Sequence, residues 1–305
     1  MLRKKALNRI YLTTLVLFIM LISFTFEFLA SDKDNTLNEV EYVSNLKMTH
    51  IYLLNQDNYL VKVDILITKD NIIEKAEEIL NNLYVDNKKY NNLKGLIPSN
   101  TKINNISLEN DTIIVDFSND LLKVNSSLEE KVIESIVYSL LEIDNIKNVK
   151  ILIEGETLEK LEKSNKSLPI LLNSTFGINK SYDIKSLKDT KKVVLYYGYE
   201  TSDKDYYVPV TKYVNSSNDK IKIIIDSLQG NYLGNTTLKS YLNKNNEIKT
   251  FHVDNDILTI TFNALNDDTL EEVTYSLASS VFNSTDTTKI IFELNNKIVD
   301  IKEKE

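Results

Sequence analysis

The sequence contains no cysteine, and its 305 residues include two histidines, six glycines and three prolines. Without cysteine there is no disulfide framework, no thiol nucleophile and no thiolate metal site. His50 and His252 lie far apart, without the short spacing of paired metal ligands. Neither a glycine-rich phosphate loop nor a glycine-flanked nucleophilic serine is present. The sequence therefore predicts no cofactor and no metal site, and it favours a binding or assembly role over an enzymatic one.

The chain is acidic, with a formal net charge of −8. Its first thirty residues are basic, so the remainder carries a charge of about −11 at neutral pH. Such a surface repels the phosphate backbone that supplies most of the affinity for nucleic acids. We therefore expect no nucleic-acid partner.

A long apolar run near the N-terminus predicts a membrane anchor. Residues 10–30 are almost free of charge and are about the length of a spanning helix. Two interpretations remain open, a cleaved signal peptide and a retained signal anchor. A cut after Ala30 would place Phe28 where signal peptidase prefers a small residue, so retention is favoured. The sequence therefore predicts a single-pass protein of the cell membrane, with the basic residues 1–9 in the cytoplasm. Residues 31–46 would form a polar tether to the rest of the chain, which would lie outside the cytoplasm.

The rest of the chain contains two stretches with the same order of expected elements. Alternating β-branched residues around polar turns predict strand hairpins, and apolar residues at helical spacing predict helices. In the first stretch the expected strands are 50–53, 59–68, 103–108, 112–117 and 149–153, with helices over 72–83 and 128–141. In the second the expected strands are 193–199, 206–213, 248–253, 257–262 and 290–294, with helices over 221–228 and 270–281.

Capping boxes are expected at the start of the longer helix of each stretch, because Ser, Thr or Asp followed three residues later by Glu can satisfy the free N–H groups there. The expected pairs are Ser126 with Glu129, or Ser127 with Glu130, in the first stretch and Asp268 with Glu271 in the second.

Four short motifs in the first stretch resemble the GerM domain, the module of a sporulation and spore germination family. They are Leu96-Ile97-Pro98-Ser99-Asn100-Thr101, Val115-Asp116-Phe117-Ser118, Ile136-Val137-Tyr138-Ser139-Leu140 and Val149-Lys150-Ile151-Leu152-Ile153-Glu154-Gly155. Their order and spacing carry the resemblance. It implies an α+β protein with two tandem small domains, each a mainly antiparallel sheet with two helices packed on it, behind one transmembrane helix. The predicted limits are 47–158 for the first repeat, 159–190 for a linker and 191–302 for the second repeat.

The two repeats differ in their motif letters. Superposing them places Ile260-Thr261-Phe262 on Val115-Asp116-Phe117. Because the acid is replaced by Thr261, we expect Asp116 to be a solvated residue and not a catalytic one. Phe117 and Phe262 keep their places and are expected in the core.

Tyrosines cluster on the first hairpin of the second repeat, and aromatic rings are favoured at binding surfaces. Half of them must point inward if the strands alternate, so a core role competes with a contact role. The candidate protein-contact patch is formed by Tyr196, Tyr197, Tyr199, Tyr206 and Tyr207.

The resemblance implies a non-enzymatic role in sporulation or germination, scaffolding a complex between mother-cell and forespore membranes, because the family's fold resembles ring-building modules. Partners would be envelope or spore-assembly proteins, or further copies of the chain, with membrane attachment through residues 10–30 since no cysteine can carry lipid. Two alternatives stay open. One is an accessory module that binds peptidoglycan, because GerM-like domains also occur beside cell-wall amidases, and the other is a general envelope protein.

Overall fold

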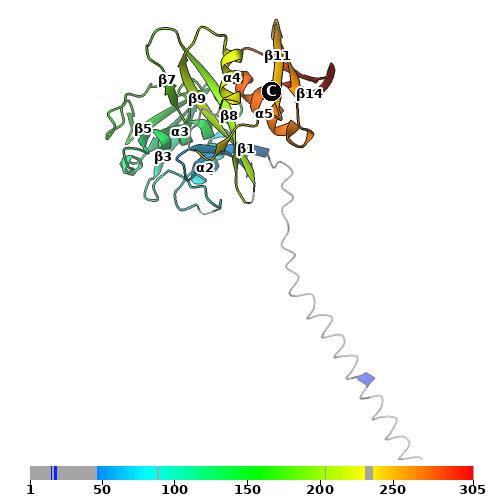
Figure 1. Cartoon of the computed structure of the whole chain (residues 1–305). Helices are drawn as coiled ribbons and strands as arrows, with labels where there is room; N and C mark the ends of the chain where they lie inside the picture. The colour runs from blue at the N-terminus through cyan, green and yellow to red at the C-terminus, as the bar shows by residue number, and fades with distance from the viewer. Residues whose placement is uncertain are drawn as a thin grey trace, which may run out of the picture. The chain divides into compact units, whose positions relative to one another are not determined.

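The computed structural model describes residues 15, 17–18, 47–87, 89–202, 204–230 and 236–304. The expected cytoplasmic tail, transmembrane anchor and tether therefore lie outside the described residues, apart from helical positions Leu15, Leu17 and Phe18. Within the described residues no helix is long and apolar enough to cross a membrane. The fold below is that of the compact unit Leu46–Glu305 (Figure 1).

Both repeats follow the same order of elements, as the sequence patterns predict. The first repeat consists of β1 (Lys47–Leu54), β2 (Leu60–Ile67), α2 (Ile72–Asn81), β3 (Ile103–Glu109), β4 (Thr112–Phe117), α3 (Glu129–Leu140), β5 (Asn148–Ile153) and β6 (Glu156–Thr157). The second consists of β8 (Thr190–Glu200), β9 (Asp205–Asn215), α4 (Lys220–Gln229), β10 (Leu238–Lys239), β11 (Glu247–Asp254), β12 (Ile257–Ala264), α5 (Leu270–Phe282), β13 (Lys289–Leu294) and β14 (Lys297–Glu303). Between them lies β7 (Ser181–Asp183).

Each repeat has a four-stranded sheet of its own, β3-β4-β5-β6 in the first and β11-β12-β13-β14 in the second. The central pairs, β4 with β5 and β12 with β13, are parallel, so α3 and α5 are the crossover helices that parallel pairing requires. Asn110 and Asn255 turn the corresponding hairpins in left-handed backbone conformations, with φ of 56° at both. Phe117 and Phe262 are buried in these sheets, as predicted.

The first hairpins of the two repeats do not form separate sheets. They join in one sheet of order β1-β2-β9-β8-β10, with β7 beside β9. The long strands β8 and β9 run through the middle of the compact unit (Figure 1). The two repeats are therefore one packed body, a feature that the repeat pattern did not predict.

The predicted capping boxes are wrong in both repeats. In the described chain no side chain caps the first turn of α3 or α5, whose N-cap residues are Leu128 and Thr269. The carboxylate of Glu129 instead accepts hydrogen bonds from the backbone N–H groups of Lys163 and Ser164, at 2.8 and 2.7 Å. In the first repeat, contacts from a distant segment have therefore replaced the local one.

Asp116 is partly exposed on β4, and it also has a structural role. Its carboxylate accepts the backbone N–H of Gly155 at 2.9 Å and the side-chain amide of Asn104 at 3.4 Å. Gly155 has a φ of +85° in the turn between β5 and β6. Asp116 thereby holds the turn that leads to β6, a strand too short to be predicted.

Candidate functional site

The junction of the two repeats depends on a break in the shared sheet. Strands β2 and β9 pair where Lys62 lies opposite Tyr207. Two residues further along, Pro209 would face Leu60, but proline has no N–H to donate. The ladder therefore needs another donor at this position.

Asn179, from the predicted linker, supplies that donor. Its side-chain NH₂ donates to the carbonyl oxygens of Leu60 and Pro209, both at 2.8 Å, and its side-chain oxygen accepts the N–H of Leu60 at 2.8 Å. The amide thus takes the place of a peptide group between the strands. Asn179 has a φ of 50° and is buried.

An ion-pair cluster on α3 positions Asn179. The carboxylate of Glu134, nearly inaccessible to solvent, accepts the backbone N–H of Asn179 at 3.0 Å and pairs with Lys131 at 3.3 Å and Lys180 at 3.1 Å. Burial lowers the pKa of Lys131, although the adjacent Glu134 opposes that shift. Burial would raise the pKa of Glu130, but hydrogen bonds from Lys166 and Lys180 outweigh it and the pKa is lowered.

Serines on the crossover helices bond to the backbone of β1 and β8 in the shared sheet. On α3, Ser139 Oγ accepts the N–H of Tyr52 at 2.9 Å, and Ser135 Oγ donates to the carbonyl of Tyr52 at 2.7 Å. On α5, Ser280 and Ser276 make the same two bonds to Tyr196, at 2.9 and 2.6 Å. Because β1 is an edge strand of the sheet, free backbone groups on it would invite unwanted pairing, and Ser135 and Ser139 occupy those of Tyr52.

A second polar cluster lies on β1 and β2 near the end of α3. Glu142 lies 2.8 Å from His50 Nδ1 and accepts the hydroxyl of Tyr52 at 2.7 Å. Burial would raise the pKa of Glu142, but the bond from His50 and the charge of Lys62 lower it. Lys204, from the turn between β8 and β9, reaches across to Asp64 at 2.6 Å. This cluster ties the second repeat to the first.

The predicted tyrosine patch is mostly interior. Tyr196, Tyr197 and Tyr199 are buried, and burial raises the pKa of each hydroxyl. Tyr206 and Tyr207 are partly exposed, and the ring of Tyr207 packs 4.1 Å from that of Tyr275. A role in partner contact requires exposed rings. The tyrosines of β8 are not exposed, because both faces of this strand are covered.

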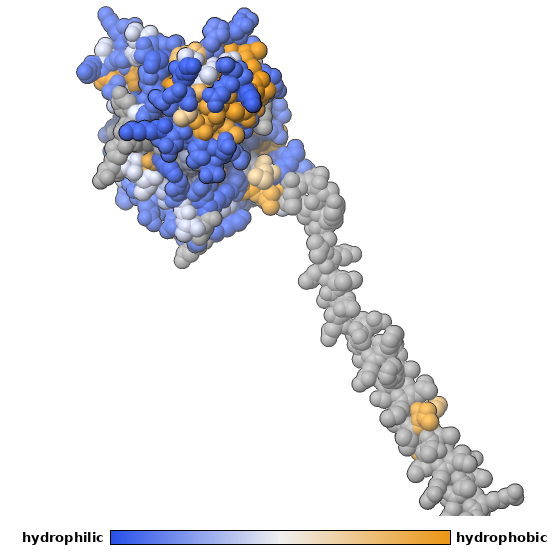
Figure 2. Space-filling view, turned by 45° about the vertical axis from the view of Figure 1, so that its right-hand side comes forward, coloured by the Kyte–Doolittle hydropathy of each residue, from blue (hydrophilic) through white to orange (hydrophobic). Residues whose placement is uncertain are grey.

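A different surface is apolar. Figure 2 shows apolar side chains gathered in one area of the compact unit, surrounded by hydrophilic ones. Exposed apolar residues on the second four-stranded sheet include Ile257, Ile298 and Ile301. His252 is also exposed on β11. Among the residues that the structure describes, no three His, Asp or Glu side chains form a group able to hold a metal ion.

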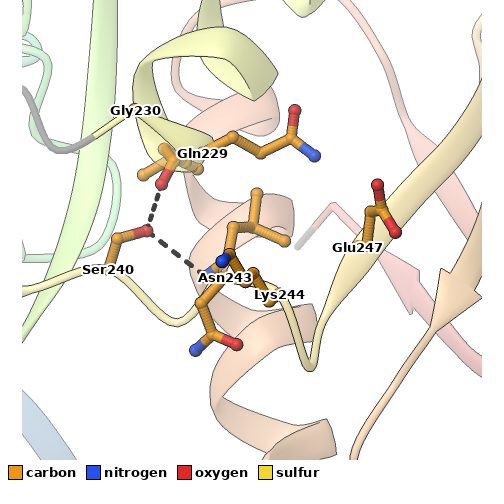
Figure 3. Close-up of a pocket in the computed structure, with 8 residues that line it drawn as sticks. Gln229, Gly230, Ser240, Asn243, Lys244 and Glu247 are labelled. Atoms are coloured by element: carbon orange, nitrogen blue, oxygen red, sulfur yellow. Dashed lines mark hydrogen bonds between the residues drawn. The ribbon is translucent and has the colours of Figure 1, made fainter.

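The cavity in Figure 3 has a volume of about 750 Å³ and lies between the end of α4 and the segment before β11. Ser240 Oγ donates to the carbonyl of Leu228 and accepts the N–H of Leu242 at 3.3 Å. The charged residues of its lining are Lys244 and Glu247. Ser240 therefore holds two neighbouring segments together and is not arranged as a nucleophile.

Comparison with known proteins identifies the first repeat. Residues 50–159 match the family model described as "Germane: Sporulation and spore germination". A stretch of 119 residues is 33% identical to the spore germination protein GerM of Bacillus subtilis (strain 168). Residues 50–159 are thus similar to the Germane family. The match to GerM spans 38% of this chain and 32% of that protein, so about a third of the relative's length is aligned.

The fold of both repeats is that of tandem GerMN domains. The solved structure of the tandem GerMN domains of GerM from Bacillus subtilis superposes with a TM-score of 0.71, covering 83% of this chain and 92% of that one. At 22% identity this likeness shows the fold alone. The resemblance to the GerM family expected from the sequence is confirmed.

The residues that join the two repeats were missed by sequence reasoning. Asn179 lies in a segment that was expected to be a linker, and the serines of α3 and α5 were not singled out. One available signal was the recurrence of Ser at four-residue spacing within an apolar helix face in both repeats, Ser135 and Ser139 in one and Ser276 and Ser280 in the other.

Proposed function

We propose that this protein is a non-enzymatic envelope protein of sporulation or germination that scaffolds a complex between mother-cell and forespore membranes. The observation that carries the proposal is the Germane domain at residues 50–159 within a tandem GerMN fold. Asn179 of the linker bonds to both repeats, and Lys204 of the second repeat pairs with Asp64 of the first, which suits a rigid architectural part.

We further propose that residues 10–30 anchor the chain with the GerMN unit outside the cytoplasm. The cysteine-free sequence allows a direct test with single introduced thiols. In protoplasts of vegetative cells that express the full chain, Leu187→Cys should react with a membrane-impermeant maleimide, because Leu187 is 91% exposed. Lys5→Cys should react after lysis alone. Labelling of Lys5→Cys in intact protoplasts would reverse the proposed orientation.

Timing of expression and the deletion phenotype test the scaffolding role. In the native host we expect the protein in sporulating cells, and we expect its deletion to lower the yield of heat-resistant or germinating spores. Constant vegetative expression with normal sporulation would favour a general envelope role. Sedimentation of the purified full chain with peptidoglycan would favour the wall-binding alternative.

We also propose that the protein contacts a partner through the tyrosine-rich hairpin. Of its tyrosines, the partly exposed Tyr206 and Tyr207 are the candidate contact residues. Tyr206→Ser should weaken cross-linking to envelope partners in sporulating cells while the unfolding transition stays unchanged. Tyr182→Ser is the matched control, since Tyr182 is 63% exposed and lies on β7. Ile298→Ser tests the apolar surface in the same assay. Loss of cross-linking with Ile298→Ser alone would move the contact from the tyrosines to that surface.

A further inference from the structure

A second cavity, of about 490 Å³, lies on the shared sheet between the two repeats. Tyr52 of β1 and Tyr196 of β8 both line it, together with Tyr138 of α3 and Phe282 at the end of α5. The volume is within the range of about 300 to 1,000 Å³ that small-molecule sites occupy, and such sites combine apolar walls with a few polar groups. Its aromatic walls offer flat apolar surface to a ligand.

Three lysines line the same cavity and have backbone carbonyls as their partners. Lys192 Nζ donates to the carbonyls of Ser174 and Thr175, at 3.0 and 3.1 Å. Lys220 Nζ donates to the carbonyl of Ser284 at 2.7 Å, and Lys304 Nζ lies 3.4 Å from the carbonyl of Thr285. An ammonium group has three N–H donors, so each lysine retains at least one for a ligand.

The charge of this cavity is unbalanced. Among the described residues that line it there is no Asp or Glu. By contrast, the described lining of the cavity in Figure 3 contains one Lys and one Glu, and that of the cavity beside Tyr206 and Tyr207 contains two Lys and two Asp besides His50. Burial, and then the charges of Lys220 and Lys180, lower the pKa of Lys192. A bound anion would relieve this repulsion between cations in a chain whose net charge is −8.

We propose that this cavity binds a small molecule that carries two or more phosphate or carboxylate groups, with its remaining part against the aromatic walls. Lys192, Lys220 and Lys304 would supply the charge-assisted hydrogen bonds. The site draws on both repeats, the linker and Lys304, which follows β14, so it requires the assembled tandem fold. This inference goes beyond the scaffolding role and does not depend on it.

Isothermal titration calorimetry at constant ionic strength tests the proposal. The purified full chain is titrated with pyrophosphate and, separately, with citrate. We expect saturable binding of one molecule per chain by at least one probe, and the better probe identifies phosphate or carboxylate as the preferred group. The variant Lys220→Gln with Lys304→Gln should bind at least about tenfold more weakly, because each lost charged hydrogen bond is worth that much. Both side chains are exposed, so folding should be unaffected.

The matched control is Lys249→Gln with Lys297→Gln, which removes the same charge from exposed positions on β11 and β14. It should bind as the wild type does. If neither probe shows saturable binding up to a concentration of about 10 mM, well above the dissociation constant expected for a specific site, the proposal is overturned. Equal weakening in the control and the cavity variant would also overturn it, since it would show a general effect of net charge.

Discussion

Asn179 joins three segments of the chain through its side chain and its backbone N–H. Its amide bonds to Leu60 and Pro209 on neighbouring strands, and its backbone N–H bonds to Glu134 on α3. Buried peptide groups that lose their partners cost more free energy than an average hydrogen bond contributes. Asn179 is therefore the residue on which the continuity of the shared sheet depends most directly.

Replacing Asn179 by glycine should destabilise the fold by about 2 to 4 kcal/mol, because it removes the amide while keeping the left-handed backbone accessible. The urea dependence of unfolding of the full chain measures this. Asn255→Gly is the control, since Asn255 has the same kind of backbone conformation in an exposed turn. Equal effects of the two substitutions would mean that the amide contributes nothing and that glycine entropy explains the change.

Glu142 should make the stability depend on acid. Its pKa is held below the ordinary value of 4.5 by the bond from His50 and the charge of Lys62, which outweigh burial. A carboxyl with a lowered pKa stabilises the folded state above that pH, and this contribution is lost as the pH falls below about 4.5. Glu142→Gln should therefore lower the urea midpoint at pH 7 and have a smaller effect near pH 3.5. Glu77→Gln, on the exposed side of α2, should have little effect at either pH.

Helices α3 and α5 each carry out two tasks. Their apolar residues pack in the core, where Val132, Ile136 and Leu140 of α3 and Leu277 of α5 are buried. Their serines bond to the backbone of Tyr52 and Tyr196. Serine has a low helix propensity, but its hydroxyl can bond to the backbone of a strand. These serines therefore stabilise the tertiary contact and not the helix itself.

Ser139→Ala should cost about 1 to 3 kcal/mol, because it leaves the N–H of Tyr52 buried without an acceptor. Amide hydrogen exchange at Tyr52 should become faster, whereas exchange at Tyr196 should stay as it is. Ser126→Ala is the control, because this exposed serine was expected to cap α3 and does not. A loss with Ser126→Ala as large as that with Ser139→Ala would contradict both assignments.

The two repeats form one body at the scale of the whole molecule. The shared sheet, the Asn179 bonds and the Lys204–Asp64 pair all cross between them. The segment expected to be a linker adds β7 to the same sheet. Such a body should unfold in a single cooperative transition.

Truncating a core phenylalanine in either repeat tests that cooperativity. Phe117→Ala and Phe262→Ala should each cost about 3 to 5 kcal/mol, since both rings are buried. Each should shift one common melting transition of the full chain. Two separate transitions, with the substituted repeat melting first, would show that the repeats are independent.

Sequence reasoning succeeded where short-range patterns decide and failed where distant segments meet. The alternation around Phe117 and the helical spacing of Val132, Ile136 and Leu140 located the core correctly. The Ser126–Glu129 capping box failed because the backbone of Lys163 and Ser164 engages Glu129, and the Asp268–Glu271 box failed because Asp268 lies in a 3₁₀ turn that Asn266 caps. The tyrosines of β8 alternate as expected, but periodicity does not tell whether the second face of a strand is covered.

The sequence by itself determined the repeated order of elements, the core phenylalanines and the similarity of residues 50–159 to the Germane family. These follow from side-chain periodicity and short motifs, which act over a few residues. Tertiary structure alone decided that the hairpins share one sheet and that Asn179 replaces the donor that Pro209 lacks. Leu60 and Asn179 are 119 residues apart in the chain, and such a contact depends on how whole elements pack.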